Sequence, residues 1–238
     1  MANPIGAVQG RPGFVSDVQS AQVAAFMRGV YWWMFGGLAV TAVVALAIAS
    51  SPAAVGTLVR VPLLFWGVVI LQLVLVVFLS ARVAKLAPST AGTLFLAYSA
   101  LTGVTFSLIL LAYTGASVAS AFFVTAGMFG ALAVYGSVTK RDLTGMGRFM
   151  FMGLVGLVLA SIVSIFWRND AMQFVMGVVG VLVFSGLIAY DSQRLRGMAL
   201  ELQGGQAASY AIVGALSLYL DFINLFISLL RLFGNRRD

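Results

Sequence analysis

The stretch ALSLYLDFINLFISLLRLF, residues 215–233, decides the fold class of this chain. It is apolar along almost its whole length, and it approaches the roughly 20 residues that a helix needs to cross the hydrocarbon core of a bilayer. A single carboxylate, Asp221, lies inside it. A charge at that depth costs about 2.5 to 3.5 kcal/mol on the insertion scale. The stretch therefore predicts a membrane helix with one face toward a bundle interior or a water-filled cavity.

Similar apolar segments recur through the rest of the chain. The composition is 61% hydrophobic and 9% charged, whereas soluble domains carry roughly 25% charged residues. This composition excludes a soluble fold and favours an all-α membrane protein, a seven-transmembrane-helix bundle. We place the seven spans at residues 29–50, 61–80, 91–113, 116–137, 149–167, 171–190 and 207–233.

The parts outside the spans are short. We interpret residues 1–28 as a polar amino-terminal arm, of which 1–15 is flexible and 16–28 forms an interfacial helix, and we do not interpret them as a cleavable signal peptide. Residues 29–233 form the membrane domain, and residues 234–238 form a basic tail. The chain is thus expected to be one bundle with a short extension at each end.

The positions of Lys and Arg predict the orientation. With the amino terminus in the cytoplasm, nine of the fourteen basic residues lie on the inner side, as the positive-inside rule favours. The absence of Cys fits a location in a bacterial inner membrane. Arg231, Arg236 and Arg237 would then lie outside, so a re-entrant last segment is an alternative that returns the tail to the cytoplasm.

Small residues at every fourth position predict where helices approach each other closely. In the segment 149–167 they are Gly156, Ala160 and Ser164, and in 116–137 they are the pairs Ala126/Gly130 and Gly127/Ala131.

The absence of Cys and His limits the chemistry of the chain. It excludes disulfides, thiol nucleophiles, Cys/His zinc sites, His-ligated haem and Ser-His catalysis. We therefore expect no enzyme and no resident cofactor. The net charge of +7 comes from scattered basic residues, so we expect contact with the lipid bilayer and no nucleic-acid binding.

Two of the seven acidic residues fall in or at the edge of apolar runs. Asp221 belongs to a polar stripe of Ser217, Asp221, Asn224 and Ser228, at steps of four, three and four along a helix. The stripe would either line a functional interior or only hold helices together. Asp191 ends the sixth run, where Arg194 could neutralise it from the same helix surface.

The two acids can meet only under one of two conditions. Either the sixth helix continues past Tyr190, or the last helix enters the membrane late, near Gly214 and after the Gly204-Gly205 pair. Carboxylates that share a site titrate as a coupled pair, which would make a proton-operated switch. Asp191 and Asp221 could also bind Ca²⁺, weakly and transiently, because they supply few of the oxygens that this ion prefers.

Four stretches give the chain a resemblance to a known family. They are LTGVTFSLILLAYT at 101–114, AFFVTAGMFGALAVYGSVTKRDLTGMGRF at 121–149, IAYDSQRL at 188–195 and LSLYLDFINLFISLLRLFG at 216–234. Together they resemble the Bax inhibitor-1 family of membrane proteins, also called the transmembrane Bax-inhibitor-motif family, in its bacterial branch.

The resemblance implies a seven-helix fold with the last helix central and a pH-sensitive calcium leak governed by an aspartate pair. Asp191 and Asp221 occupy the positions of that pair. The family also places a basic residue at the cytoplasmic end of the second helix, for which Arg82, or alternatively Lys85, is the match. Leu108 stands where a proline is often found, which implies a straighter third helix.

Three hypotheses follow. The first is a leak channel for Ca²⁺, gated by protons and closed when Arg82 pairs with the aspartates. The second is a regulator that binds other membrane proteins and transports nothing. The third, an intramembrane aspartyl protease, is disfavoured because the bulky residues Leu218, Tyr219 and Leu220 precede Asp221 where such enzymes need a Gly-x-Gly-Asp turn.

Overall fold

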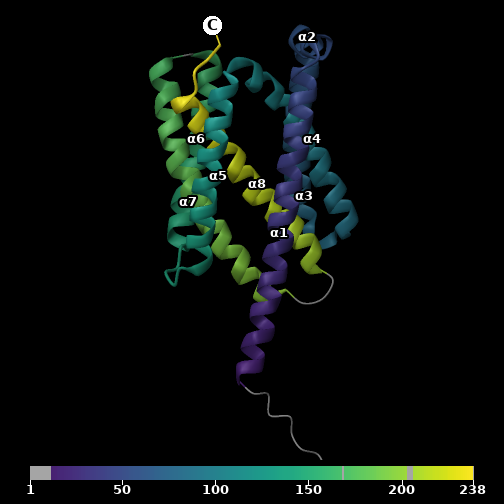
Figure 1. Ribbon diagram of the computed structural model, residues 1–238, viewed down its shortest axis with the longest axis vertical. Coiled ribbons are helices and arrows are strands. Elements are labelled where there is room, and N and C mark those ends of the chain that lie inside the picture. Colours follow the sequence, from purple (N-terminus) through teal and green to yellow (C-terminus); the bar gives the residue numbers. More distant parts are fainter. Residues whose placement is uncertain (1–11, 168, 203–205, 238) are drawn as a thin grey trace, which may run out of the picture.

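The protein is a bundle of long helices (Figure 1). The computed structural model describes residues 12–167, 169–202 and 206–237. Seven of its helices are long and apolar enough to cross a membrane, which confirms the predicted fold class. The elements are α1 (Pro12–Ala49), α2 (Pro52–Arg60), α3 (Pro62–Arg82), the 3₁₀ turn η1 (Val83–Lys85), α4 (Pro88–Ala112), α5 (Gly115–Val138), α6 (Thr144–Phe166), α7 (Asp170–Glu201) and α8 (Gln206–Phe233).

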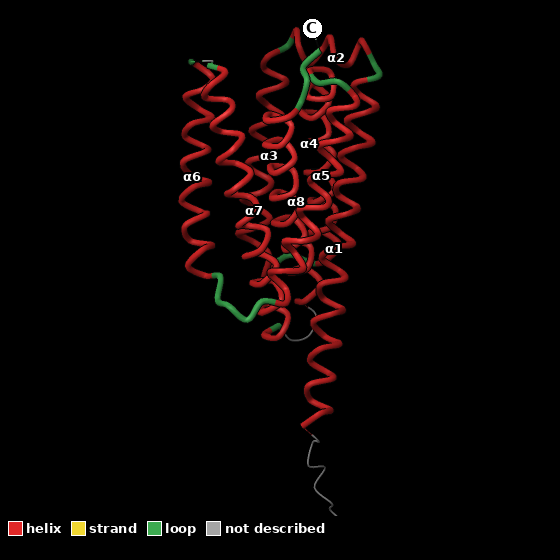
Figure 2. The backbone as a smooth tube through the Cα atoms, turned by 60° about the vertical axis from the view of Figure 1, so that its left-hand side comes forward, coloured by secondary structure: helices red, strands yellow, loops and turns green. Residues whose placement is uncertain are grey.

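α8 lies in the centre of the bundle, as the family resemblance implied. It packs against α1, α4, α5 and α7, and Figures 1 and 2 show it running through the bundle between them. Of its most apolar window 72% is buried, against 39% or less for each of the other six spans. The helix that carries Asp221 is therefore shielded from lipid by its neighbours on most sides.

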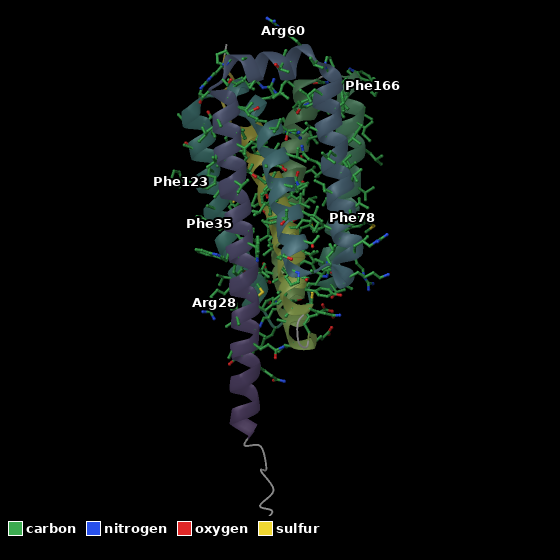
Figure 3. All side chains as sticks on the ribbon, turned by 90° about the vertical axis from the view of Figure 1, so that its right-hand side faces the viewer. Arg28, Phe35, Arg60, Phe78, Phe123 and Phe166 are labelled. Atoms are coloured by element: carbon green, nitrogen blue, oxygen red, sulfur yellow. The ribbon has the colours of Figure 1, made fainter. Side chains whose placement is uncertain are left out.

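The outer surface is apolar over the height of the bundle. Figure 3 shows Phe35, Phe78, Phe123 and Phe166 pointing outward at levels between Arg28 near one end and Arg60 at the other. Phe123 and Phe166 are 73% and 86% exposed. Such a surface would be unstable in water and matches a hydrocarbon environment, so the chain is an integral multi-pass membrane protein.

The first helix differs from the prediction. Residues 16–28 are helical, as predicted, but they are not a separate element, because α1 runs without a break from Pro12 into the membrane span. An early turn of α1 packs on the carboxyl-terminal end of α7. There Gln22 Nε2 donates two hydrogen bonds of 2.9 Å, to the carbonyl oxygens of Ala199 and Leu202. The flexible arm predicted over 1–15 lies mostly outside the described residues.

The sixth span is longer than its apolar run. α7 continues eleven residues beyond the predicted end at 190, to Glu201. This is the first of the two conditions under which the aspartates can meet. α8 is already helical from Gln206, and Gly214 lies inside it, close to the side chain of Leu195 on α7. The Gly204-Gly205 pair lies outside the described residues.

The carboxyl-terminal tail lies at the end of the bundle opposite the start of α1 (Figure 1). Hydrogen bonds fasten it to the connection between α4 and α5: Thr114 N donates to the Asn235 carbonyl oxygen over 3.0 Å, and Asn235 N to Ser117 Oγ over 2.9 Å. α8 thus crosses the bundle once, and the re-entrant alternative is wrong.

The predicted small-residue contacts are also wrong. A Cβ added at Gly127, Gly130 or Gly156 would meet nothing within 4 Å. The close approaches lie at other glycines. At Gly136 on α5, a Cβ would collide with the backbone of Ala189 on α7, and at Gly147 on α6 it would collide with the ring of Tyr190. Both contacts hold α5 and α6 against the part of α7 that directly precedes Asp191.

These contacts lead to a stability prediction. Gly136→Ala should destabilise the protein by about 1 to 3 kcal/mol, because the backbone of Ala189 cannot move aside without separating α5 from α7. Gly130→Ala on the same helix is the matched control. It adds a methyl group in open space and should leave the unfolding midpoint unchanged or slightly raised. Thermal unfolding of the purified variants in detergent measures both, and equal midpoints would contradict the packing at Gly136.

The distribution of charge leads to a topological prediction. Reporter fusions after Arg141, in the connection between α5 and α6, should be read in the cytoplasm, and fusions after Arg237 in the periplasm. The physical reason is that most Lys and Arg residues lie at the Arg141 end of the bundle. Reversed signals at the two positions would overturn this orientation, and matching signals would contradict the single crossing of α8.

Candidate functional site

Asp191 and Asp221 face one cavity between α6, α7 and α8. Its volume is about 750 Å³. Both residues are buried: 8% of the surface of Asp191 and 6% of that of Asp221 is exposed. The two carboxylates are close enough to interact electrostatically. The residues that line it are Gly147, Arg148, Phe151, Met152, Leu154, Phe184, Leu187, Tyr190, Asp191, Arg194, Ser217, Leu220, Asp221 and Asn224.

A hydrogen bond across the helix interface holds the pair in place. Ser217 Oγ on α8 donates to Asp191 Oδ2 on α7. Asp221 lies one turn further along α8, on the same face as Ser217. Its Oδ2 atom is buried and has no hydrogen-bond partner among the described residues. Because buried polar atoms are nearly always partnered, this oxygen is available to a proton or a cation.

The cavity is the middle member of a column of three. Toward the amino-terminal end it adjoins a cavity of about 230 Å³, with which it shares Asp191, Arg194 and Ser217. Toward the other end it adjoins one of about 280 Å³, with which it shares Leu154, Phe184 and Asn224. The column follows the predicted polar stripe of α8.

All four residues of the predicted stripe line the column of cavities, although they form different hydrogen bonds. Asn224 Nδ2 donates to the carbonyl oxygen of Leu220 over 2.8 Å, and Ser228 Oγ donates to that of Asn224 over 2.7 Å. Both donors are thus satisfied within α8. Asn224 lines both the central cavity and the cavity of about 280 Å³.

The cations near the pair are not the ones that the resemblance implied. The structure does not bring Arg82 to the aspartates: its side chain is exposed, and the guanidinium lies 5.7 Å from the centre of the Phe78 ring on the same helix. Lys85 is exposed as well. Arg194 lines both the central cavity and the cavity of about 230 Å³, and it acts electrostatically on Asp191. Arg148 on α6 lines the central cavity only.

Sequence reasoning missed the residues that hold the carboxyl-terminal end of α7 in place. Gln193 accepts a hydrogen bond of 2.9 Å at Oε1 from Leu143 N and donates one of 2.7 Å from Nε2 to the Arg141 carbonyl oxygen. Arg196 donates to the carbonyl oxygen of Ser137. These bonds fasten the connection between α5 and α6 to α7. The polar residues that follow Asp191 could have predicted this, because they are typical of a helix that continues beyond the hydrocarbon layer.

Asp142, in that same connection, is an acid of a different kind. Hydrogen bonds from the side chain and the backbone amide of Thr144 lower the pKa of Asp142 below its ordinary value. The amide nitrogen lies 2.9 Å from Oδ1. Asp142 therefore stays ionised at neutral pH, and a titration near neutrality would have to come from another group.

Comparison with known proteins agrees with this arrangement. A family model described as "Inhibitor of apoptosis-promoting Bax1" matches residues 23–238. The chain belongs to the Bax inhibitor-1 family. The matched range holds all seven spans apart from the first turns of α1, and it includes both aspartates.

Bacterial members of the Bax inhibitor-1 family resemble the chain over most of its length. The inner membrane protein YbhL of Escherichia coli K12 is 48% identical over 220 residues, covering 91% of this chain and 94% of the relative. A protein of Deinococcus radiodurans is 46% identical over 218 residues, covering 91% and 93%. A membrane protein of Streptococcus pyogenes is 43% identical over 180 residues, covering 76% and 78%.

Proposed function

We propose that this protein is a pH-sensitive leak for cations, with Ca²⁺ as the permeant ion, in a bacterial inner membrane. The observation that carries the proposal is the burial of Asp191 and Asp221 in the middle cavity of a column that follows the central helix. The name of the YbhL relative supports the choice of membrane.

The pair is balanced by few charges. The charged and titratable groups that line the two cavities of the pair are Arg148 from α6, Tyr190 and Arg194 from α7, and Tyr210 from α8. α3 contributes only Ser80 and η1 only Val83, and the third cavity of the column adds Arg231 from α8. Carboxylates in a site of low polarity cannot both ionise cheaply. The protonation of the pair therefore changes the charge balance of the whole cavity.

The same oxygens suit a permeant divalent cation. Ca²⁺ prefers six to eight oxygen ligands, and the cavity offers the two carboxylates, the Ser217 hydroxyl and the Asn224 carbonyl oxygen. Among the described residues, no three side chains of His, Cys, Asp and Glu gather at one point. Such a site binds briefly, as a leak requires, because an ion that is held tightly does not leave.

The switch has a mechanical basis in the packing of α6, α7 and α8. The bond from Ser217 to Asp191 joins α7 to α8 where the central cavity meets the cavity of about 230 Å³. We call this point, lined by Asp191, Arg194 and Ser217, the inner neck of the column. In the described chain α6 packs mainly on α7, so the cavities separate it from α8. A change in the charge of Asp191 alters the bond to Ser217, and this shifts the balance between a closed and an open spacing of the helices.

Removing one charge tests the pair directly. Asp221→Asn keeps the shape and deletes the ionisation, so the fold should survive and the pH response should flatten. In liposomes that contain only this protein, Ca²⁺ flux between pH 6 and pH 8 should change by about tenfold in the wild type and by less than about twofold in the variant. Asp191→Asn should be non-additive with Asp221→Asn.

Glu201→Gln is the matched control, because Glu201 is an exposed acid on the same helix as Asp191, at the carboxyl-terminal end of α7. It should keep the wild-type pH profile. Equal profiles for Asp221→Asn and the wild type would reduce Asp221 to a contact between helices. Absence of flux in correctly inserted wild-type protein would overturn the leak and favour a regulator that binds other membrane proteins.

The counter-charge can be identified in the same assay. Arg194→Gln should raise the leak at neutral pH by about fivefold, which corresponds to about 1 kcal/mol of closed-state stability, because Arg194 acts on Asp191 at the inner neck. Arg82→Gln should leave the flux unchanged, since its side chain lies over Phe78. The reverse result would assign the gating role to Arg82.

A further inference from the structure

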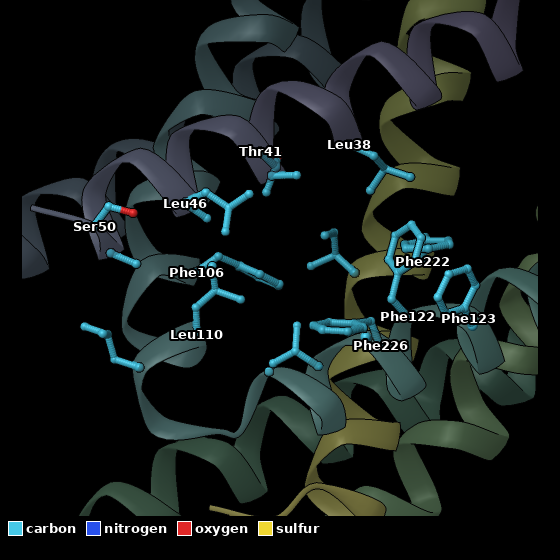
Figure 4. Close-up of a pocket in the computed structure, with 18 of the residues that line it drawn as sticks. Leu38, Thr41, Leu46, Ser50, Phe106, Leu110, Phe122, Phe123, Phe222 and Phe226 are labelled. Carbon is cyan, nitrogen blue, oxygen red and sulfur yellow. The ribbon is translucent and has the colours of Figure 1, made fainter. Parts of the chain in front are cut away.

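A second large cavity lies on the side of α8 away from the acid pair. Its volume is about 610 Å³, within the range of sites that enclose small molecules. It is formed by α1, α4, α5 and α8, and Figure 4 shows apolar side chains from these helices around an open space. Phe106, Phe122, Phe222 and Phe226 provide its aromatic wall.

The cavity opens sideways, toward the hydrocarbon of the bilayer. α1 and α5 form its two rims, and in the described chain they do not pack together, although each packs on α8. The rim side chains Leu46, Phe122 and Phe123 are 59%, 45% and 73% exposed. An apolar molecule that moves within the membrane can therefore enter without leaving the hydrocarbon.

The interior makes no polar demand on an occupant. Thr41, at the deep end, already bonds within the protein: its Oγ1 lies 2.9 Å from the carbonyl oxygen of Ser99 and 2.7 Å from the hydroxyl of Tyr219. Apolar cavities of this kind are poorly filled by water. The lining thus suits a hydrocarbon chain.

The end of the cavity nearest the tail carries a positive charge. Arg237 lines it, and the Arg237 amide is held by a hydrogen bond of 3.0 Å to the carbonyl oxygen of Ala112. The described charged residues at this end of the bundle are Arg60, Arg231, Arg236 and Arg237, against one acid, Asp170. An anionic group would be attracted to this end.

We propose that this cavity binds an anionic glycerophospholipid from the leaflet at the carboxyl-terminal end of the bundle. One acyl chain lies between α1 and α5 against Phe222 and Phe226, and the phosphate is bound by the guanidinium of Arg237. The planar fork of an arginine matches the two free oxygens of a phosphate diester. The surplus of arginine at this end favours a headgroup with net negative charge over a zwitterionic one.

Native mass spectrometry of the whole protein in detergent tests the proposal, with phosphatidylglycerol and phosphatidylcholine as probes. The wild type should retain one phosphatidylglycerol in preference to phosphatidylcholine. Ala119→Phe and Ala42→Phe fill the cavity from opposite rims, where both alanines are exposed, and should abolish retention of either lipid. Arg237→Ala should weaken phosphatidylglycerol by about tenfold and phosphatidylcholine by less, because only phosphatidylglycerol carries a net charge for this guanidinium to balance, so the preference between the two lipids should shrink.

Two matched controls separate the cavity from general surface effects. Ala126→Phe places the same ring on an exposed position of α5 that does not line the cavity, and Arg28→Ala removes an exposed charge near the opposite end of the bundle. Both should bind like the wild type. Retention by Ala119→Phe and Ala42→Phe at wild-type levels would overturn the proposal, as would equal losses in the controls. Equal binding of both lipids by the wild type would overturn the role of Arg237.

Discussion

The cost of placing carboxylates within the hydrocarbon layer is the constraint on which the rest of this structure depends. Asp221 lies inside the last membrane helix, and a lipid-facing position there would be unstable. The fold meets this constraint by surrounding α8 with α1, α4, α5 and α7. Asp191, on the neighbouring helix, is enclosed by the same packing. The sequence of α8 therefore requires the central position that this helix has in the bundle.

α8 divides the interior into two chemically different halves. The stripe from Ser217 to Ser228 faces α6 and α7, where the three linked cavities lie. The other side carries aromatic rings. Tyr219 meets Phe95 at a centroid distance of 5.7 Å, and Phe222 meets Phe129 at 5.7 Å, both edge to face. One helix thus supports a polar column and an apolar cavity at the same depth, because successive residues point about 100° apart around its axis.

The inner neck of the polar column exists because α7 is longer than the membrane-spanning run within it. Hydropathy falls after Tyr190, yet the helical hydrogen bonds continue to Glu201. The added turns carry Gln193 and Arg196 to the connection between α5 and α6, where they bond to backbone groups. They also bring Asp191 within reach of Ser217. The point where a chain leaves the hydrocarbon and the point where its helix ends are separate properties.

The sequence alone determined the seven spans, the polar stripe on the last of them and the two acids that the bundle encloses in one cavity. Each of these follows from the high cost of polar groups in lipid, because that cost makes membrane spans apolar and makes the few polar residues inside them easy to identify from the sequence. Only the tertiary structure decided which glycines allow close contact, Gly136 and Gly147 in place of Gly127 and Gly156, and which arginine accompanies the pair, Arg194 in place of Arg82. In a membrane protein both the buried and the lipid-facing sides of a helix are apolar, so the sequence pattern does not fix how each helix is rotated. Packing against neighbouring helices sets this rotation, and the rotation determines which residues of each helix are in contact.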